Sequence, residues 1–174
     1  MKKFLVVVDM QNDFVDGALG SDEAVAIVDN VVEKIKNFDG EIFATFDTHF
    51  ENYLETSEGK KLPVEHCIKG SDGWLLNKKV ENALNEKGFT SVEKLTFGSL
   101  ELPKLIEKKA QGEDFTIELC GLCTDICVVS NALILKASFR ETEITVDSSC
   151  CAGVSVETHN CALKTMQCCQ INVV

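Results

Sequence analysis

Cationic charge is scarce in this 174-residue chain, which has 17 Lys and Arg against 28 Asp and Glu and a formal net charge of −11. Binding to nucleic-acid phosphates depends on clustered Lys and Arg, and an anionic membrane surface attracts the same residues. The composition therefore argues against both kinds of partner, and we expect neither nucleic-acid binding nor attachment to a membrane.

Long hydrophobic runs are also missing. Lys2 and Lys3 followed by the apolar residues 4–8 resemble the start of a signal peptide, but Asp9 ends the run before a hydrophobic core of that kind forms. No run approaches the roughly 20 apolar residues that span a bilayer. The nine cysteines are odd in number and irregularly spaced, which argues against a disulfide framework. We therefore expect a cytoplasmic protein with reduced thiols.

Strand-like and helix-like patterns alternate along the whole chain. Apolar runs predict strands over residues 4–8, 41–46, 91–94, 115–119, 143–146 and 171–174. Amphipathic patterns predict helices over residues 24–35, 77–85, 99–109, 127–138 and 156–167, the first of them with Ser21 as its N-cap. This alternation predicts an α/β fold, a doubly wound sheet covered by helices, in one domain over residues 1–174.

Reactive side chains follow four different predicted strands, each at or just past the carboxyl end: Asp9, Asp47, Lys94 and Cys127. Ligands of open parallel sheets bind beyond these ends, so the four groups are expected to share one edge. There Asp9 would accept the thiol proton of Cys127, while Lys94 balances the negative charges. The backbone N–H groups of Cys123 and Cys127 would face a developing oxyanion. This pattern predicts a cysteine amidase or esterase.

The segment around Cys127 indicates a turn from a buried strand into a helix, with Thr124 or Asp125 as the N-cap. A thiol in the first turn would have its pKa lowered by the helix dipole. The alternative is that Cys127, like Cys120 and Cys123, is a small buried hydrophobe. An iron–sulfur or zinc site on these three cysteines is disfavoured, because the fourth thiolate would have to come from a distant pair.

A candidate metal site begins with Asp47 and His49, which point to the same side of an extended segment. His66 follows within a loop of roughly 25 residues, a length that is commonly functional, and Glu55 or Glu58 would add an oxygen. Two imidazoles and a carboxylate suit zinc, iron or manganese. An Asp-x-His pair also arises by chance, so its weight depends on the neighbouring reactive groups.

These motifs together resemble the isochorismatase-like cysteine hydrolases, especially their nicotinamidase and pyrazinamidase branch. The matching segments are Asp9–Phe14, Asp47–His49, His66–Cys67, Lys94 with Phe97, and Gly121–Val128. The resemblance implies a three-layer sandwich whose six-stranded, mostly parallel sheet has the order 3-2-1-4-5-6. It also implies a catalytic triad of Asp9, Lys94 and Cys127, and a cis peptide at Leu122–Cys123.

The same resemblance implies a cofactor and a reaction. A divalent metal ion, zinc before iron or manganese, would bind Asp47, His49 and His66 and hold the pyridine nitrogen of nicotinamide. Phe14 and Phe97 would pack against the ring, and hydrolysis through a thioester would release the acid and ammonia. The partner would be this small amide, and the protein would be a homo-oligomer.

Departures from the branch keep other functions open. Thr48 stands where many nicotinamidases carry Trp, and Pro63 stands where some carry an aromatic residue that stacks on the substrate. Trp74 would stack on the substrate in its place or anchor the following helix in the core. The alternatives are hydrolysis of another small amide or carbamoyl compound, and a non-catalytic thiol or metal-binding protein in which the nine cysteines matter more than the triad.

Overall fold

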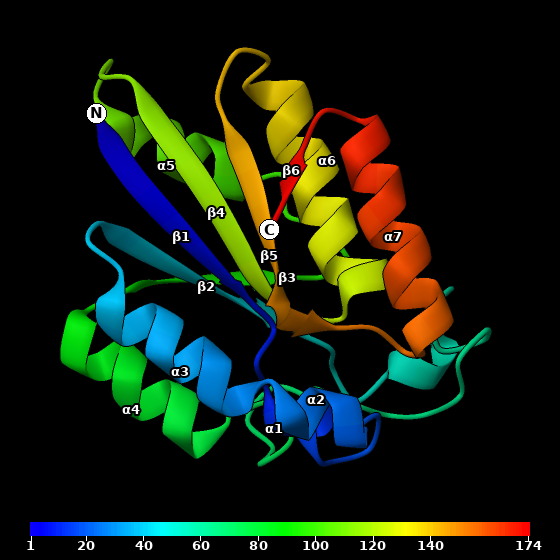
Figure 1. Cartoon of the computed structure of the whole chain (residues 1–174). Coiled ribbons are helices and arrows are strands. Elements are labelled where there is room, and N and C mark those ends of the chain that lie inside the picture. The colour runs from blue at the N-terminus through cyan, green and yellow to red at the C-terminus, as the bar shows by residue number, and fades with distance from the viewer.

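The computed structural model describes residues 1–174 as one open sheet between two layers of helices (Figure 1). The strands are β1 (Lys2–Val8), β2 (Glu41–Asp47), β3 (Thr90–Lys94), β4 (Phe115–Leu122), β5 (Ile144–Ala152) and β6 (Asn172–Val173). The helices are α1 (Asn12–Val15), α2 (Asp22–Ala26), α3 (Val28–Asn37), α4 (Lys78–Lys87), α5 (Leu102–Ala110), α6 (Val129–Ser138) and α7 (Val156–Cys168). Two short turns are the 3-10 turn η1 (Tyr53–Glu55) and the π turn η2 (Thr124–Val128).

All six strands are parallel, in the order β3-β2-β1-β4-β5-β6. Helices α3 and α4 lie on one face of the sheet, and α5, α6 and α7 lie on the other (Figure 1). The predicted doubly wound α/β fold and its strand order are confirmed. The order reverses between β1 and β4, and their carboxyl ends are where a sheet of this kind forms its crevice.

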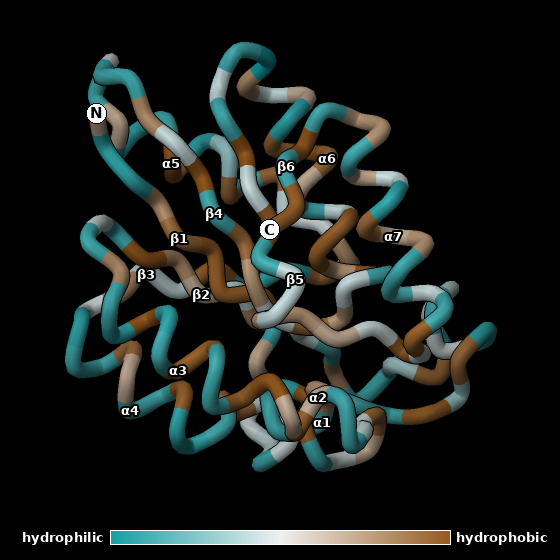
Figure 2. The backbone as a smooth tube through the Cα atoms, in the orientation of Figure 1, coloured by the Kyte–Doolittle hydropathy of each residue, from teal (hydrophilic) through white to brown (hydrophobic).

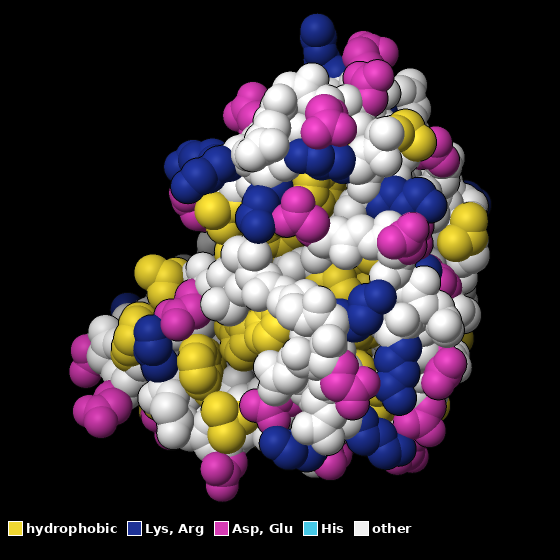
Figure 3. Space-filling view, turned by 90° about the vertical axis from the view of Figure 1, so that its left-hand side faces the viewer, with side chains coloured by type: hydrophobic (Ala, Val, Ile, Leu, Met, Phe, Trp, Pro, Cys, Tyr) yellow, Lys and Arg dark blue, Asp and Glu magenta, His cyan; other side chains and the backbone are white.

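The apolar patterns explain the layers. Residues 4–8 of β1 are completely buried, as expected for a central strand covered on both faces, and Figure 2 shows the hydrophobic colouring along this strand. Helix α3 buries Val28, Val31 and Ile35 and leaves its polar side exposed. No helix combines the length and apolar character needed to cross a bilayer. On the face seen in Figure 3, acidic and basic side chains are interspersed and no histidine reaches the surface.

The first predicted helix is divided in two. Ser21 caps α2 as predicted, because its hydroxyl oxygen accepts the Ala24 N–H at 3.0 Å. Helix α2 ends at Ala26, and α3 begins at Val28 after a break at Ile27. The amphipathic spacing continues across this break, since both helices bury apolar residues against the same sheet face, and so the sequence predicted one helix.

The predicted end of β5 was wrong. Val146 pairs with Leu119, but the next pair joins Cys151 to Gly121, so two steps along β4 match five along β5. The intervening residues, including Asp147, form a bulge, after which the strand continues to Ala152. Asp147 therefore interrupts the ladder without ending the strand.

Lys34 of α3 connects that bulge to the sheet, with its Nζ 2.8 Å from Asp147 and 3.0 Å from Glu118. Burial works against ionisation of Asp147, but its hydrogen bonds from Lys34 and Ser149 lower the pKa of this carboxyl below the ordinary 3.8. Because the pKa is lower in the folded state, the stabilisation is present above the unfolded-state value and is lost as the pH falls through the folded-state value.

Asp147→Asn is therefore expected to lower the free energy of unfolding at pH 7 by about 0.5–1 kcal/mol, discounted for partial exposure. Urea unfolding of both proteins at pH 7 and at pH values below 3.8 measures the effect, and the difference should shrink at the acid end. A difference of equal size at both ends would contradict the ion pair's contribution.

Candidate active site

The site begins where β1 approaches β4 most closely. Gly121 has φ +115°, and a Cβ there would lie 2.1 Å from the Val8 carbonyl oxygen, so this contact requires glycine. Asp9, which follows the last residue of β1, has a left-handed backbone conformation with φ 47°. Its N–H donates to the Thr45 carbonyl at 3.3 Å and lies 3.2 Å from the Thr45 hydroxyl. The chain is therefore turned sharply at the end of β1 and held against β2.

Asp9, Lys94 and Cys127 come together at this edge, each less than 5% exposed. The Lys94 Nζ lies 2.7 Å from Asp9 Oδ2 and 3.4 Å from Cys127 Sγ. The Thr45 hydroxyl donates to Asp9 Oδ1 at 2.6 Å, while Asp9 Oδ2 has no aligned hydrogen-bond donor. Oδ2 therefore faces Lys94 as its ion-pair partner and has no further donor.

Burial and charge together shape the proton affinities. Burial raises the pKa of Asp9, with Asp47 adding to the rise and Lys94 opposing it. Burial works against the charge of Lys94, but Asp9, the facing thiol and Asp47 outweigh it and raise the pKa of this ammonium. A raised pKa makes Asp9 a stronger base than an exposed aspartate, beside a lysine that stays charged.

Burial raises the pKa of Cys127 well above its ordinary value, and Asp9 adds to the rise while Lys94 opposes it. The expected lowering by a helix dipole was wrong, because the thiol is buried against carboxylates at a five-residue turn. The predicted caps were wrong as well. Thr124 Oγ1 lies 2.8 Å from His159 Nδ1, and Asp125 accepts the N–H of Val154, so both side chains bind the β5–α7 connection instead.

The expected cis peptide at Leu122–Cys123 was also wrong, since every peptide bond is trans. The trans form is the low-energy default for residues other than proline, and here the positive φ of Gly121 and the π turn redirect the chain. The Cys123 carbonyl accepts the N–H groups of Ile126 and Val128, each at 3.1 Å, and skips that of Cys127. The Cys127 N–H therefore does not donate to this carbonyl.

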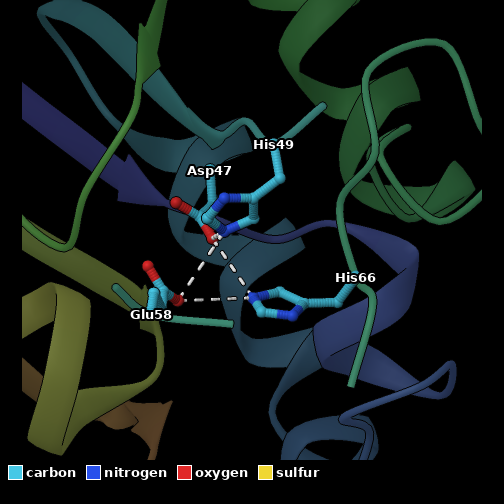
Figure 4. A group of neighbouring side chains, drawn as sticks. All are labelled: Asp47, His49, Glu58 and His66. Atoms are coloured by element: carbon cyan, nitrogen blue, oxygen red, sulfur yellow. Dashed lines mark hydrogen bonds and ion pairs between the residues drawn. The ribbon is translucent and has the colours of Figure 1, made fainter. Parts of the chain in front are cut away.

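Asp47, His49, Glu58 and His66 form a second cluster, shown in Figure 4, with their ligand atoms all within 4.8 Å of one another. Asp47 Oδ2 lies 3.0 Å from His49 Nε2 and 3.6 Å from His66 Nε2. Glu58 Oε1 lies 3.7 and 3.8 Å from the same two nitrogens. Glu58, rather than Glu55, belongs to the cluster. Ligands about 2.1 Å from a shared ion have separations of this size, so the donor set fits a divalent metal.

Neighbouring groups hold these ligands in place. His66 Nδ1 lies 2.8 Å from the Val64 carbonyl oxygen. This contact orients the ring so that Nε2 points toward the cluster. Burial opposes ionisation of Asp47, but hydrogen bonds with His49 and His66 hold its pKa below the ordinary value. The Tyr53 ring makes T-shaped contacts with both imidazoles. Asp47 Oδ1 also lies 3.1 Å from Lys94 Nζ, so one lysine contacts both clusters.

Asp13 positions the His66 segment through the next residue. Its Oδ2 accepts the Cys67 N–H at 2.7 Å, and Cys67 has a left-handed backbone with φ 47°. Asp13→Ala is expected to weaken the binding of a divalent metal by about tenfold, the scale of a lost supporting contact around a ligand. Titration with zinc measures this, with the exposed Asp16→Ala as the control. A folded Asp13→Ala variant with unchanged metal affinity would refute this role.

A pocket of about 460 Å³ opens at His49 and Glu58 of the second cluster, and its lining residues Leu95 and Ile126 are sequence neighbours of Lys94 and Cys127. It is lined by His49, Thr56, Ser57, Glu58, Lys61, Leu62, Leu95, Thr96, Phe97 and Ile126. A hollow of about 510 Å³ between α3 and β5 is lined mostly by polar residues, including Lys34 and Asp147, and contains no residue of either cluster. The 460 Å³ pocket is therefore the one that contains residues of the second cluster and sequence neighbours of Lys94 and Cys127.

The aromatic residues expected at the substrate are distributed differently. Phe97 lines the pocket, whereas Phe14 makes a T-shaped contact with His66, with ring centroids 5.5 Å apart. Trp74 does not line the pocket. Its indole N–H donates to the Thr48 hydroxyl at 3.0 Å, and its ring packs on Phe46. Of the two roles expected for Trp74, these contacts fit anchoring in the core.

Two buried residues at the site were missed by the sequence reasoning. Thr45 lies two positions before Asp47 on β2, so the two side chains point to the same side of the strand. This two-residue spacing would have predicted Thr45 as a neighbour of the site. Gln11 accepts the Asp47 N–H and donates to the Asp47 carbonyl, at 2.8 and 2.9 Å. No sequence period joins these two segments, so only the folded chain reveals this pairing.

A buried thiol, lysine and carboxylate at the carboxyl edge of a doubly wound sheet, beside a metal-type cluster, define an α/β enzyme of the hydrolase class. The Isochorismatase domain model matches residues 3–174. The isochorismatase family protein PncA of Bacillus subtilis is 32% identical over 178 residues, covering 94% of this chain and 93% of that protein. The chain belongs to the isochorismatase family.

Solved structures agree with this assignment. The nicotinamidase/pyrazinamidase PncA from Bacillus subtilis is 25% identical with a TM-score of 0.86, and the match covers 100% of both chains. The pyrazinamidase of Pyrococcus horikoshii, solved in complex with zinc, is 24% identical with a TM-score of 0.81, covering 100% of this chain and 99% of that one. The second likeness demonstrates a shared fold.

Proposed function

We propose that this protein hydrolyses nicotinamide to nicotinate and ammonia, with Cys127 as the nucleophile. The observation that carries the proposal is the position of Lys94 Nζ, which contacts Asp9, Cys127 and Asp47 at 2.7, 3.4 and 3.1 Å. This single ammonium joins a thiol and its base to the metal-type cluster. The nicotinamidase among the similar structures supports the choice of substrate.

Acylation begins with transfer of the Cys127 thiol proton to Asp9 Oδ2, the oxygen that lacks an aligned donor. The sulfur attacks the amide carbonyl carbon, and the carbonyl electron pair moves to oxygen. That oxyanion would face the N–H groups of Cys123 and Cys127. When the C–N bond breaks, the proton held by Asp9 passes to nitrogen, ammonia leaves, and a thioester remains on Cys127.

Deacylation uses the same groups in reverse. Asp9 accepts a proton from water, whose oxygen attacks the thioester carbonyl. The C–S bond then breaks, the acid is released and the proton returns to the Cys127 sulfur. Lys94 stays charged throughout, since its neighbours raise its pKa, and it limits the repulsion between Asp9 and the thiolate.

The metal cluster would orient the substrate. Asp47, His49, His66 and Glu58 would hold a divalent ion, and zinc is our assignment because it binds histidine nitrogen and carboxylate oxygen ligands such as these. Bound there, such an ion would supply a Lewis acid for the pyridine nitrogen of nicotinamide. The pocket volume of about 460 Å³ lies in the usual range for small-molecule sites, and Phe97 offers an apolar surface to the ring.

A panel of amides tests the proposal. Ammonia release is measured with the zinc-loaded protein and nicotinamide, pyrazinamide and an N-carbamoyl amino acid, with acid formation checked by chromatography. The highest kcat/KM is expected for nicotinamide. A higher value for the carbamoyl compound would overturn the substrate while leaving the thiol chemistry, and no ammonia from any of the three would favour a non-catalytic metal-binding protein.

A further inference from the structure

A histidine outside both clusters contacts the turn that carries Cys127. His159 lies in the first turns of α7, and its Nδ1 is 2.8 Å from the hydroxyl oxygen of Thr124, which is fully buried. Thr124 precedes Cys127 by three residues within η2. Neither the proton transfers nor the metal cluster described above uses this histidine.

The segment before α7 holds the histidine rigidly. Ser155 and Thr158 form a capping box at the start of α7, which fixes the first turn of the helix. Gly153 packs so closely that a Cβ there would lie 2.9 Å from the His159 Cβ. The imidazole is therefore presented to Thr124 from a stiff support.

A second contact joins the same two segments. The Asp125 carboxylate accepts the Val154 N–H at 3.1 and 3.2 Å. Consecutive side chains of η2 are thus bound to the β5–α7 connection, while the preceding Cys123 provides no side-chain cap. A five-residue turn has little stability of its own, so these two contacts help to set its orientation, together with the hydrogen bond from the Asn131 amide to the Cys127 carbonyl at 2.8 Å.

We propose that His159 is a positioning residue for the nucleophile. By accepting a hydrogen bond from the Thr124 hydroxyl, it holds η2 so that Cys127 Sγ faces Asp9 and Lys94. The proposal rests on the function proposed above. Burial lowers the pKa of His159, with Asp125 opposing, which favours the neutral ring that accepts a hydrogen bond at Nδ1. Losing the bond would let the sulfur and the Cys127 N–H shift together, and a misplaced nucleophile slows the reaction without weakening binding.

Variants of the pair test this role. His159→Leu and Thr124→Val remove the hydrogen bond, whereas His159→Asn keeps a polar atom near the Nδ1 position and Thr124→Ser keeps the hydroxyl. A hollow of about 410 Å³ borders His159, so the replacements fit without crowding. The first two variants are expected to lower kcat about fivefold to tenfold, with KM nearly unchanged, and the second two should retain most of the activity.

The double variant His159→Leu/Thr124→Val should be no slower than the slower single variant, because both remove one bond. Thermal unfolding and an Asn160→Ala control show whether an effect is merely structural.

A second readout is the pH profile for alkylation of Cys127 by iodoacetamide, followed by peptide mass spectrometry. This profile should shift in the two disruptive variants. It needs no substrate, so inactivity of the wild-type protein toward nicotinamide would refute the proposed function alone. Native kcat and an unchanged alkylation profile in His159→Leu would overturn the positioning role.

Discussion

Cys127→Ala is expected to abolish ammonia release from nicotinamide, lowering kcat by at least about 10⁴-fold, as loss of a nucleophile does in other hydrolases. The substitution removes the only sulfur in contact with Lys94 Nζ, at 3.4 Å, and leaves that lysine paired with Asp9 and Asp47. The fold should therefore persist. Steady-state ammonia release by the two zinc-loaded proteins measures the effect.

The matched control is Cys161→Ala, which removes an exposed thiol on α7. This variant should retain the wild-type rate, because Cys161 has no contact with either cluster. Comparable rates for Cys127→Ala and the wild-type protein would show that the thiol is not the nucleophile.

Lys94→Met is expected to affect both stability and activity. The Asp9 and Asp47 carboxylates, at 2.7 and 3.1 Å from Lys94 Nζ, would lose their shared counter-charge while remaining buried. Removing one partner of a buried ion pair costs about 3–5 kcal/mol, so the free energy of unfolding should fall by that amount. Denaturant unfolding measures it, and amide hydrolysis should be lost in parallel.

Two further variants separate charge from packing. Lys104→Met removes an exposed lysine paired with Glu101 and should change stability little. Asp9→Asn combined with Lys94→Met removes one of the stranded charges and should recover part of the lost stability. A Lys94→Met protein as stable as the wild type would contradict the charge balance described for this site.

The fold was predictable because its strongest signals are local. The continuous apolar run of β1 and the amphipathic spacing of α3 each follow from burial on fixed faces. The strand order was implied by the family resemblance and then confirmed by the pairing. The end of β5 was not predictable, because its bulge depends on how Gly121 and Cys151 meet across two strands.

The site was predictable in outline for a related reason. Residues at the carboxyl ends of parallel strands must share an edge, and the structure brings Asp9, Lys94 and Cys127 together there. The supporting residues Gln11 and His159 were missed, since their roles depend on contacts between distant segments. The same cause misled the cap assignment: Thr124 is a good N-cap in isolation, but His159 occupies its hydroxyl.

Mass spectrometry of the wild-type protein, quenched in acid during turnover of nicotinamide, tests the chemistry most directly. A nicotinoyl group attached through a thioester to the peptide that contains Cys127 is the predicted result. Product formation with the acyl group on a different residue, or with no acylated peptide at any time, would contradict covalent catalysis by this sulfur.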